Sequence, residues 1–165
     1  MKRVILDTNI YGRIIDNKES DEIRELAEKR RDIIIYGFDV VRKELRDVAA
    51  NVRIDGKLVR MMLLGLYDKL VKFHAYSPTP EVTQLANDYF IVYSQLRGKR
   101  SKEEMLNDFL IVGCASMYEL DIVVTDDRKT MLSQQAINSY KIVNKLREHR
   151  IPEFIGYEAF RRLIS

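Results

Sequence analysis

The chain has 165 residues, of which 46% are hydrophobic and 32% are charged, and its formal net charge is +3. This length fits one domain with a sizeable core, so we expect a single domain over residues 1–165. Because Cys114 is the only cysteine, an intramolecular disulfide and a cysteine-based zinc site are excluded. The net charge is too small to predict nucleic-acid binding and does not argue against it. Without a signal peptide or an apolar run that could span a membrane, a cytoplasmic protein is expected.

Short apolar runs predict the strands of a buried sheet. Residues 4–6 (Val-Ile-Leu) show no polar alternation, which is typical of a strand covered on both faces. Residues 33–36 are compact and rich in β-branched side chains, and Gly37 is expected to end this second strand. Further strands are expected at residues 122–124 and near 153–155. Strands that alternate with helices predict an α/β fold with a mostly parallel sheet.

Amphipathic segments between these runs predict the helices. They are expected over residues 10–16, 20–27, 39–50, 58–73, 80–97, 102–118 and 134–149, with a short terminal helix after residue 155 and a loop over 51–56. The expected N-caps are Ser20, Asp39, Thr79 and Ser101. Segment 58–73 is apolar around most of its circumference, which indicates a central helix or a contact with a partner. It therefore also predicts a homodimer formed through this helix or through the helix that follows Thr79.

Acidic residues stand at or just after the ends of two predicted strands. Asp7 comes after residues 4–6, and the pair Asp126-Asp127 follows 122–124 with one residue between. In a parallel sheet both sites would lie at the carboxyl edge, where open α/β sheets bind ligands. Taken singly, each acid could instead cap a helix or a turn, and so could Asn9.

Two more acids lie within predicted helices. Glu44 is in the helix after the second strand, where it could also be a surface residue among basic neighbours. Asp108 lies between Leu106 and Phe109 in an apolar stretch, where a charge needs a reason, although an ion pair with a basic neighbour would supply one.

A cluster of these acids would have a coherent chemistry. Carboxylates a few ångströms apart raise each other's pKa unless a cation neutralises them. Oxygen ligands without cysteine or clustered histidine favour Mg²⁺ or Mn²⁺ over Zn²⁺. Such a site binds and polarises a phosphodiester and lowers the pKa of a bound water, which then attacks in line. The acids therefore predict metal-dependent phosphodiester hydrolysis, with one or two metal ions.

Four segments resemble, in order, the signatures of PIN domains, which are metal-dependent ribonucleases and include many VapC-type toxins of bacterial and archaeal toxin–antitoxin modules. The segments are residues 4–9, 40–45, 107–115 and 123–127. Together they span nearly the whole chain. The resemblance implies a three-layer α/β/α PIN-like fold with a mostly parallel central sheet. It further implies RNA as the substrate, frequent homodimers and, for a toxin, a small antitoxin protein as partner.

The resemblance also implies roles for single residues. Asp7, Glu44, Asp108 and Asp127 would be the catalytic ligands of Mg²⁺ or Mn²⁺. The family's last motif, Thr-x-Asp, selects Asp127, while Asp126 stays open as an alternative fourth ligand, a ligand of a second metal or a turn cap.

Neighbouring polar side chains are expected to support these acids. Hydrogen bonds to the site would come from Thr8, Asn9 and Thr125. Basic residues beside the acidic motifs could hold phosphates on either side of the scissile one, or could form an ordinary solvated surface: Arg97, Lys99, Arg100, Lys102, Arg128 and Lys129. No feature of the sequence predicts a base preference.

Three classes of function remain open. The leading one is a Mg²⁺- or Mn²⁺-dependent endoribonuclease, either a toxin or a PIN nuclease of RNA processing or decay. The stretch over residues 51–98 is longer than in the compact toxins, so a nuclease of RNA processing or decay stays open. The second class is a catalytically inactive PIN-fold module that binds RNA or protein, against which the intact acids argue. The third is a receiver-like phosphoryl-transfer domain, which would carry paired acids after its first strand, where Asp7 stands alone.

Overall fold

A parallel five-stranded sheet forms the centre of the protein. The computed structural model describes residues 1–165, and its central sheet has the strand order β5-β2-β1-β6-β7. The strands are β1 (Lys2–Leu6), β2 (Ile33–Phe38), β5 (Ala75–Tyr76), β6 (Ile122–Val124) and β7 (Glu153–Ile155). Every neighbouring pair is parallel, so all carboxyl ends lie at one edge.

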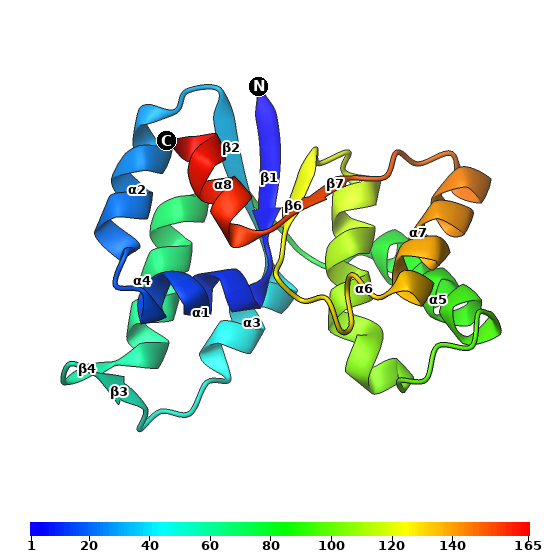
Figure 1. Ribbon diagram of the computed structural model, residues 1–165, viewed down its shortest axis with the longest axis horizontal. Coiled ribbons are helices and arrows are strands. Elements are labelled where there is room, and N and C mark those ends of the chain that lie inside the picture. Colours follow the sequence, from blue (N-terminus) through cyan, green and yellow to red (C-terminus); the bar gives the residue numbers. More distant parts are fainter.

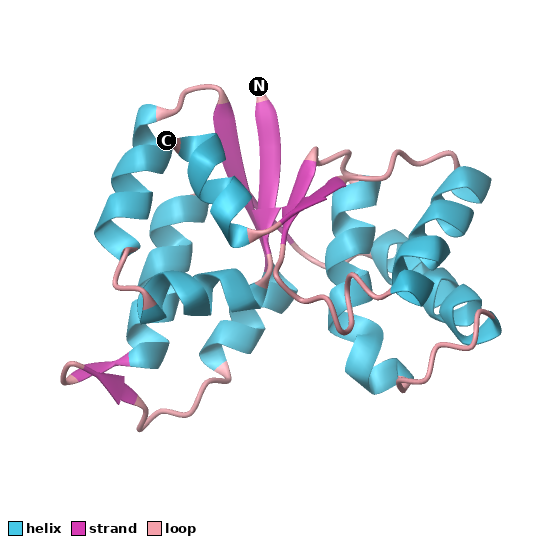
Figure 2. Ribbon diagram, viewed as in Figure 1, coloured by secondary structure: helices cyan, strands magenta, loops and turns pink.

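Helices cover both faces of this sheet. They are α1 (Thr8–Asp16), α2 (Ser20–Lys29), α3 (Asp39–Arg46), α4 (Val59–Val71), α5 (Pro80–Gln95), α6 (Lys102–Met117), α7 (Gln134–Arg147) and α8 (Tyr157–Ile164). Figure 1 shows α1, α2, α4 and α8 on one side of the strands and α5, α6 and α7 on the other. Coloured by secondary structure, the strands form the middle of three layers (Figure 2). The expected α/β/α fold with a mostly parallel sheet is confirmed.

The core explains why the central strands lack polar alternation. Val4 and Ile5 in β1 have no exposed surface and point to opposite faces of the sheet, each of which is covered by helices. Gly37 lies inside β2 rather than ending it, because the strand continues to Phe38. A Cβ atom at Gly37 would lie 2.2 Å from the Tyr67 hydroxyl oxygen of α4, so this glycine allows helix and strand to pack closely.

Two of the expected N-caps are confirmed and two are wrong. The side chains of Thr79 and Ser101 accept hydrogen bonds from backbone N–H groups in the first turns of α5 and α6. Ser20 is instead the first residue of α2, whose N-cap position is occupied by Glu19 without a side-chain bond. Asp39 likewise lies within α3, because its carboxylate accepts a hydrogen bond from the Ser77 hydroxyl instead of from the backbone of its own helix.

The segment expected as a loop contains a small hairpin, and α3 ends at Arg46 rather than at residue 50. Strands β3 (Arg53–Ile54) and β4 (Lys57–Leu58) pair antiparallel. Asp55 and Gly56 join them, both with positive φ, as a two-residue hairpin turn requires. The Asp-Gly pair was the sequence signal for this hairpin. The strand β5 was also missed, because two residues are too short to show a hydrophobic pattern.

Helix α4 is largely enclosed by its own protein. Leu63, Leu66 and Leu70 are buried, and α4 contacts α1, α2, α3 and β2. Among its large apolar side chains Met61 is strongly exposed, at 64%. Much of the apolar surface that favoured a dimer through this helix therefore lies in the core, and the homodimer stays a prediction. No helix combines the length and apolar character needed to cross a membrane.

Candidate active site

Four carboxylates approach one another at the carboxyl edge of the sheet. Asp7 follows β1 as the N-cap of α1, Glu44 lies in α3, Asp108 in α6, and Asp127 in the turn after β6. β1 and β6 are adjacent and in register, with Leu6 opposite Val124, so the chain leaves both strands side by side. Figure 1 shows α1, α3, α6 and this turn meeting at the carboxyl ends of the strands.

Asp7 is the most enclosed of the four acids, with 5% of its surface exposed. Its carboxylate accepts hydrogen bonds from the Thr8 backbone N–H at 2.7 Å, the Asn9 amide at 3.0 Å and the Thr125 hydroxyl at 2.8 Å. Burial raises the pKa of Asp7 to about 6, although the bonds from Thr125 and Thr8 oppose the increase. The charges of Glu44 and Asp127 raise this pKa further. All three expected supporting residues, Thr8, Asn9 and Thr125, therefore lie at the site.

Asp108 experiences the same repulsion from the opposite layer of the protein. Burial raises the pKa of its carboxyl to about 7, and the negative charges of Asp7, Asp127 and Glu44 add to the increase. The nearby Thr130 hydroxyl opposes this increase. Asp108 has no ion-pair partner, so a basic neighbour does not account for its charge in this apolar stretch.

Glu44 faces the site rather than solvent alone. Its carboxylate accepts a hydrogen bond from the Thr8 hydroxyl at 3.0 Å, and partial burial raises its pKa. Hydrogen bonds from Thr8 and from Asn107 oppose that increase. The role of Asn107 was not predicted from the sequence. Its position directly before Asp108 was the available signal, because that places it at the same end of α6.

Asp127 is held by the turn that follows β6. One of its carboxylate oxygens accepts the backbone N–H groups of Lys129 and Thr130, at 3.0 and 2.9 Å, and the other accepts the Thr130 hydroxyl. Its own N–H donates to the Thr125 hydroxyl at 3.0 Å. Thr130 thus holds Asp127 and lowers the pKa of the neighbouring Asp108, a role that was not predicted from the sequence. The spacing Asp-x-x-Thr, common in side-chain-capped turns, was the signal.

The adjacent Asp126 is turned away from the other acids. Its carboxylate pairs with Arg13 of α1 at 2.6 Å and accepts the backbone N–H of Tyr157 in α8 at 3.0 Å. The negative charge of Asp127 is among the main causes that raise the pKa values of Asp7 and Asp108. The structure therefore groups Asp127 with Asp7, Glu44 and Asp108, and it groups Asp126 with helices α1 and α8.

The donor set fits a hard divalent cation by its chemistry. Asp7, Glu44, Asp108 and Asp127 offer only oxygen ligands, and no basic side chain pairs with any of them. In this conformation no three acidic, histidine or cysteine side chains lie close enough to hold a metal ion together. Binding a cation through three or more of these acids would therefore require their side chains to move.

The expected RNA-binding residues fall into two groups. Arg128 and Lys129 are exposed in the turn that carries Asp127, beside the site. The others are exposed where α5 leads into α6: Arg97, Lys99, Arg100 and Lys102. Lys102 begins α6 and lies about 9 Å of helix rise before Asp108. Of this second group, Arg100 is engaged in an ion pair with Glu104, at 3.6 Å.

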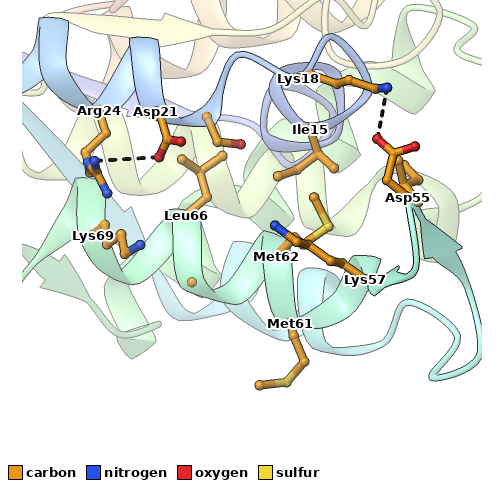
Figure 3. A pocket seen from close by; sticks show the side chains of 13 residues that line it. Ile15, Lys18, Asp21, Arg24, Asp55, Lys57, Met61, Met62, Leu66 and Lys69 are labelled. Carbon is orange, nitrogen blue, oxygen red and sulfur yellow. Dashed lines mark ion pairs between the residues drawn. The ribbon is translucent and has the colours of Figure 1, made fainter.

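A separate groove of about 400 Å³ lies between α1, α2, α4 and the hairpin (Figure 3). Its apolar lining comes from Ile15, Ile54, Met61, Met62 and Leu66. Four basic side chains line it as well: Lys18, Arg24, Lys57 and Lys69. Two of them pair with acids within the groove, Lys18 with Asp55 and Arg24 with Asp21, whereas Lys57 and Lys69 make no ion pair. An apolar floor with spare positive charge suits an acidic, amphipathic protein segment.

Comparison with solved structures reveals relatives in fold. VapBC2 from Rickettsia felis, bound to a promoter DNA fragment, matches with a TM-score of 0.60 and 14% identity over 93% of this chain and 98% of that chain. VapBC-1 from nontypeable Haemophilus influenzae matches with a TM-score of 0.59 and 12% identity over 94% and 98%. DNA-bound VapBC from Salmonella typhimurium matches with a TM-score of 0.57 and 17% identity over 95% of this chain and 99% of that chain.

These matches cover nearly the full length of both chains, so the protein has the VapC-like PIN-domain fold. No protein-family model matches the sequence, and no curated protein does. At identities of 12–17% the likeness concerns the fold, and the chemistry has to be argued from the site.

Proposed function

We propose that this protein is a Mg²⁺- or Mn²⁺-dependent endoribonuclease that hydrolyses RNA phosphodiester bonds. The observation that carries the proposal is the convergence of four carboxylates from four separate elements without a basic side chain paired to any of them. An acid without a role in binding is expected to be paired with a basic side chain, or exposed to solvent, when it lies in a folded protein. Carboxylates that repel one another lower the stability of the folded protein, which is a cost that binding a cation would relieve.

In this proposal the acids hold the metal and their neighbours orient them. Asp7, Glu44, Asp108 and Asp127 bind the ion through carboxylate oxygens. The bound ion supplies polarisation of the phosphodiester and a lowered pKa of a bound water. Thr8 and Thr125 donate to Glu44 and Asp7, which keeps the remaining oxygen lone pairs of these carboxylates directed into the site.

Positive charge beside the cluster supports RNA as the substrate. Arg128 and Lys129 are exposed in the turn that presents Asp127, where they can bind the phosphates that flank the scissile one. Contacts to phosphates position the strand but do not read its bases, so they leave the sequence preference open.

The test is cleavage of a mixed RNA pool in Mn²⁺ buffer by the wild type, Asp7→Asn and Asp108→Asn. Each substitution keeps the side-chain shape and removes a metal-binding charge, so we expect cleavage to fall by several orders of magnitude while the circular dichroism spectrum is unchanged. Asp16→Asn, at an exposed position at the end of α1, is the matched control and should cleave like the wild type. Undiminished cleavage by both site variants would refute the proposal.

For the biological role we propose the toxin of a toxin–antitoxin module, with the groove between α1, α2 and α4 as the antitoxin site. The fold shared with VapBC structures and the apolar, basic lining of the groove support this role. Where a small antitoxin protein is encoded beside this gene, Met61→Glu, at an exposed lining position, should weaken its binding and leave RNA cleavage intact. Growth arrest on expression, relieved by that small protein, distinguishes a toxin from a nuclease of RNA processing or decay. A folded protein that binds RNA without cleaving it would indicate the inactive binding module instead.

A further inference from the structure

The first residue after Thr125, Asp126, connects the candidate active site to the C-terminal helix. One carboxylate oxygen of Asp126 contacts the Arg13 guanidinium at 2.6 Å, and the other accepts the Tyr157 backbone N–H at 3.0 Å. Both oxygens are thus engaged, one by α1 and one by the first turn of α8. A carboxylate at the N-terminus of a helix also interacts favourably with the helix dipole.

Arg13 reinforces this connection. Its guanidinium lies 4.8 Å from the centre of the Tyr157 ring and also pairs with Glu158 at 3.1 Å. α1 begins at the metal-ligand candidate Asp7, so the same helix that is capped by Asp7 carries Arg13 less than two turns later. The contacts therefore tie together α1, α8 and the turn after β6.

The backbone at the start of α8 is shaped for this carboxylate. A Cβ atom at Gly156 would lie 2.8 Å from the Asp126 carboxylate oxygen, a distance that real Cβ contacts essentially never show. Gly156 has φ −86°, so its backbone conformation does not itself require glycine. The space left by the missing side chain is filled by Asp126.

We propose that Asp126 is a positioning residue which, with Arg13, Tyr157 and Gly156, fixes the turn that presents Asp127 to the carboxylate cluster. The effect of this positioning on metal binding rests on the proposed function. Asp126 lies between Thr125, which bonds to Asp7, and Asp127, which bonds to Thr130. Anchoring the middle residue restricts the backbone from which the next side chain leaves the turn, because both oxygens of Asp126 are held by elements outside it. The C-terminal helix thereby determines the geometry of the site without contacting it.

The ion pair between Arg13 and Asp126 contributes too little stability to account for this set of contacts. Arg13 and Asp126 retain 40% and 35% of their side-chain exposure, and exposed ion pairs contribute little to folding. What the contacts do provide is direction, because a carboxylate held at both oxygens cannot rotate freely.

A double-mutant cycle tests the inference. Gly156→Ala should displace the Asp126 carboxylate and weaken Mn²⁺ binding roughly tenfold, the size expected when support of a ligand is lost, and Asp126→Ala should do the same. In the double variant the added methyl group meets no carboxylate, so the loss should be no larger than in either single variant. Glu158→Gln removes the other acidic partner of Arg13 and is the matched control, with wild-type affinity expected. Calorimetric titration with Mn²⁺ measures all five proteins.

Hydrogen exchange in the metal-free proteins provides a second readout that needs no metal. The N–H groups of Asp127, Lys129 and Thr130 donate within the turn and should exchange faster in Asp126→Ala and Gly156→Ala, but not in Glu158→Gln. Wild-type exchange and affinity in both variants, or losses that multiply in the double variant, would overturn the inference. A wild type that binds no Mn²⁺ would instead refute the proposed metal site, and the exchange rates would still decide whether Asp126 positions the turn.

Discussion

The Thr125 hydroxyl donates a hydrogen bond of 2.8 Å to the Asp7 carboxylate and joins the ends of two adjacent strands inside the protein. Thr125 is 1% exposed, so this bond forms away from water, where hydrogen bonds to a carboxylate are strong. The same hydroxyl accepts the Asp127 backbone N–H at 3.0 Å. One buried side chain therefore orients two of the four acids.

Replacing Thr125 by valine should weaken the site without removing any of its four acids. Valine has nearly the same shape but neither donates to Asp7 nor accepts from Asp127, so we expect the pKa of Asp7 to rise above about 6. At pH 6.5 a larger fraction of Asp7 would be protonated, and Mn²⁺ affinity should fall on the order of tenfold. Thr125→Ser keeps the hydroxyl and should retain most of the affinity. Calorimetry of both variants measures this, and equal affinities would show that the hydroxyl has no orienting role.

Without metal, neutralising Asp108 should stabilise the protein. The pKa of an aspartate is about 3.9 in an unfolded chain and about 7 for Asp108 in the folded protein. Between these values the folded state binds more protons, so the free energy of unfolding falls as the pH rises from about 4 to about 7. Above pH 7 we expect the free energy of unfolding of Asp108→Asn in chelator to exceed that of the wild type by on the order of 4 kcal/mol, and the difference should vanish near pH 4.

Urea denaturation across this pH range measures the difference, with Asp16→Asn as the control. Mn²⁺ at a hundredfold excess over its dissociation constant should stabilise the wild type by about 2.7 kcal/mol and the Asp108→Asn variant much less. If Asp108 were only structural, the opposite pattern is expected. Asp108→Asn would then be less stable than the wild type in chelator and would still be fully stabilised by Mn²⁺.

The two adjacent aspartates should differ in their effect on metal binding. Asp127→Asn removes a proposed ligand, whereas Asp126→Asn keeps an oxygen that can accept from Tyr157 and loses only the charge paired with Arg13. We therefore expect a clearly larger loss of Mn²⁺ affinity in Asp127→Asn. Calorimetric titration decides between them, and the reverse order would make Asp126 the ligand.

A buried polar network joins the helices of one layer. The Tyr89 hydroxyl bonds to Asn144 at 2.5 Å and to Ser116 at 3.1 Å, and the Asn144 amide donates to Ser116 at 2.9 Å. Asn144→Ala removes two of these three hydrogen bonds and leaves a cavity, so stability should fall by about 2–4 kcal/mol. In that background Tyr89→Phe breaks only the remaining bond to Ser116 and should add little further loss. Urea denaturation measures the effect, and additive losses would show that the three groups do not form one network.

The sequence alone determined the parallel sheet and most helix positions, and it pointed to the four acids that the fold brings to one edge of the sheet. These features depend on local physics: β-branched runs favour strands, and side-chain caps such as Ser101 start helices. Asp7 and Asp127 could be placed because residues that follow parallel strands must emerge at one edge. The family resemblance then selected Asp127 over Asp126 by spacing, but without a physical reason for the choice.

Tertiary structure decided which way each of these side chains points. Asp126 and Asp127 are chemically identical neighbours, and only contacts from distant parts of the chain separate them: Arg13 and Tyr157 hold the first, and Thr130 holds the second within its turn. The supporting contact of Asn107 with Glu44 likewise joins two helices that are far apart in sequence. Hydrogen bonds of this kind depend on distances across the fold, which no local pattern of residues encodes.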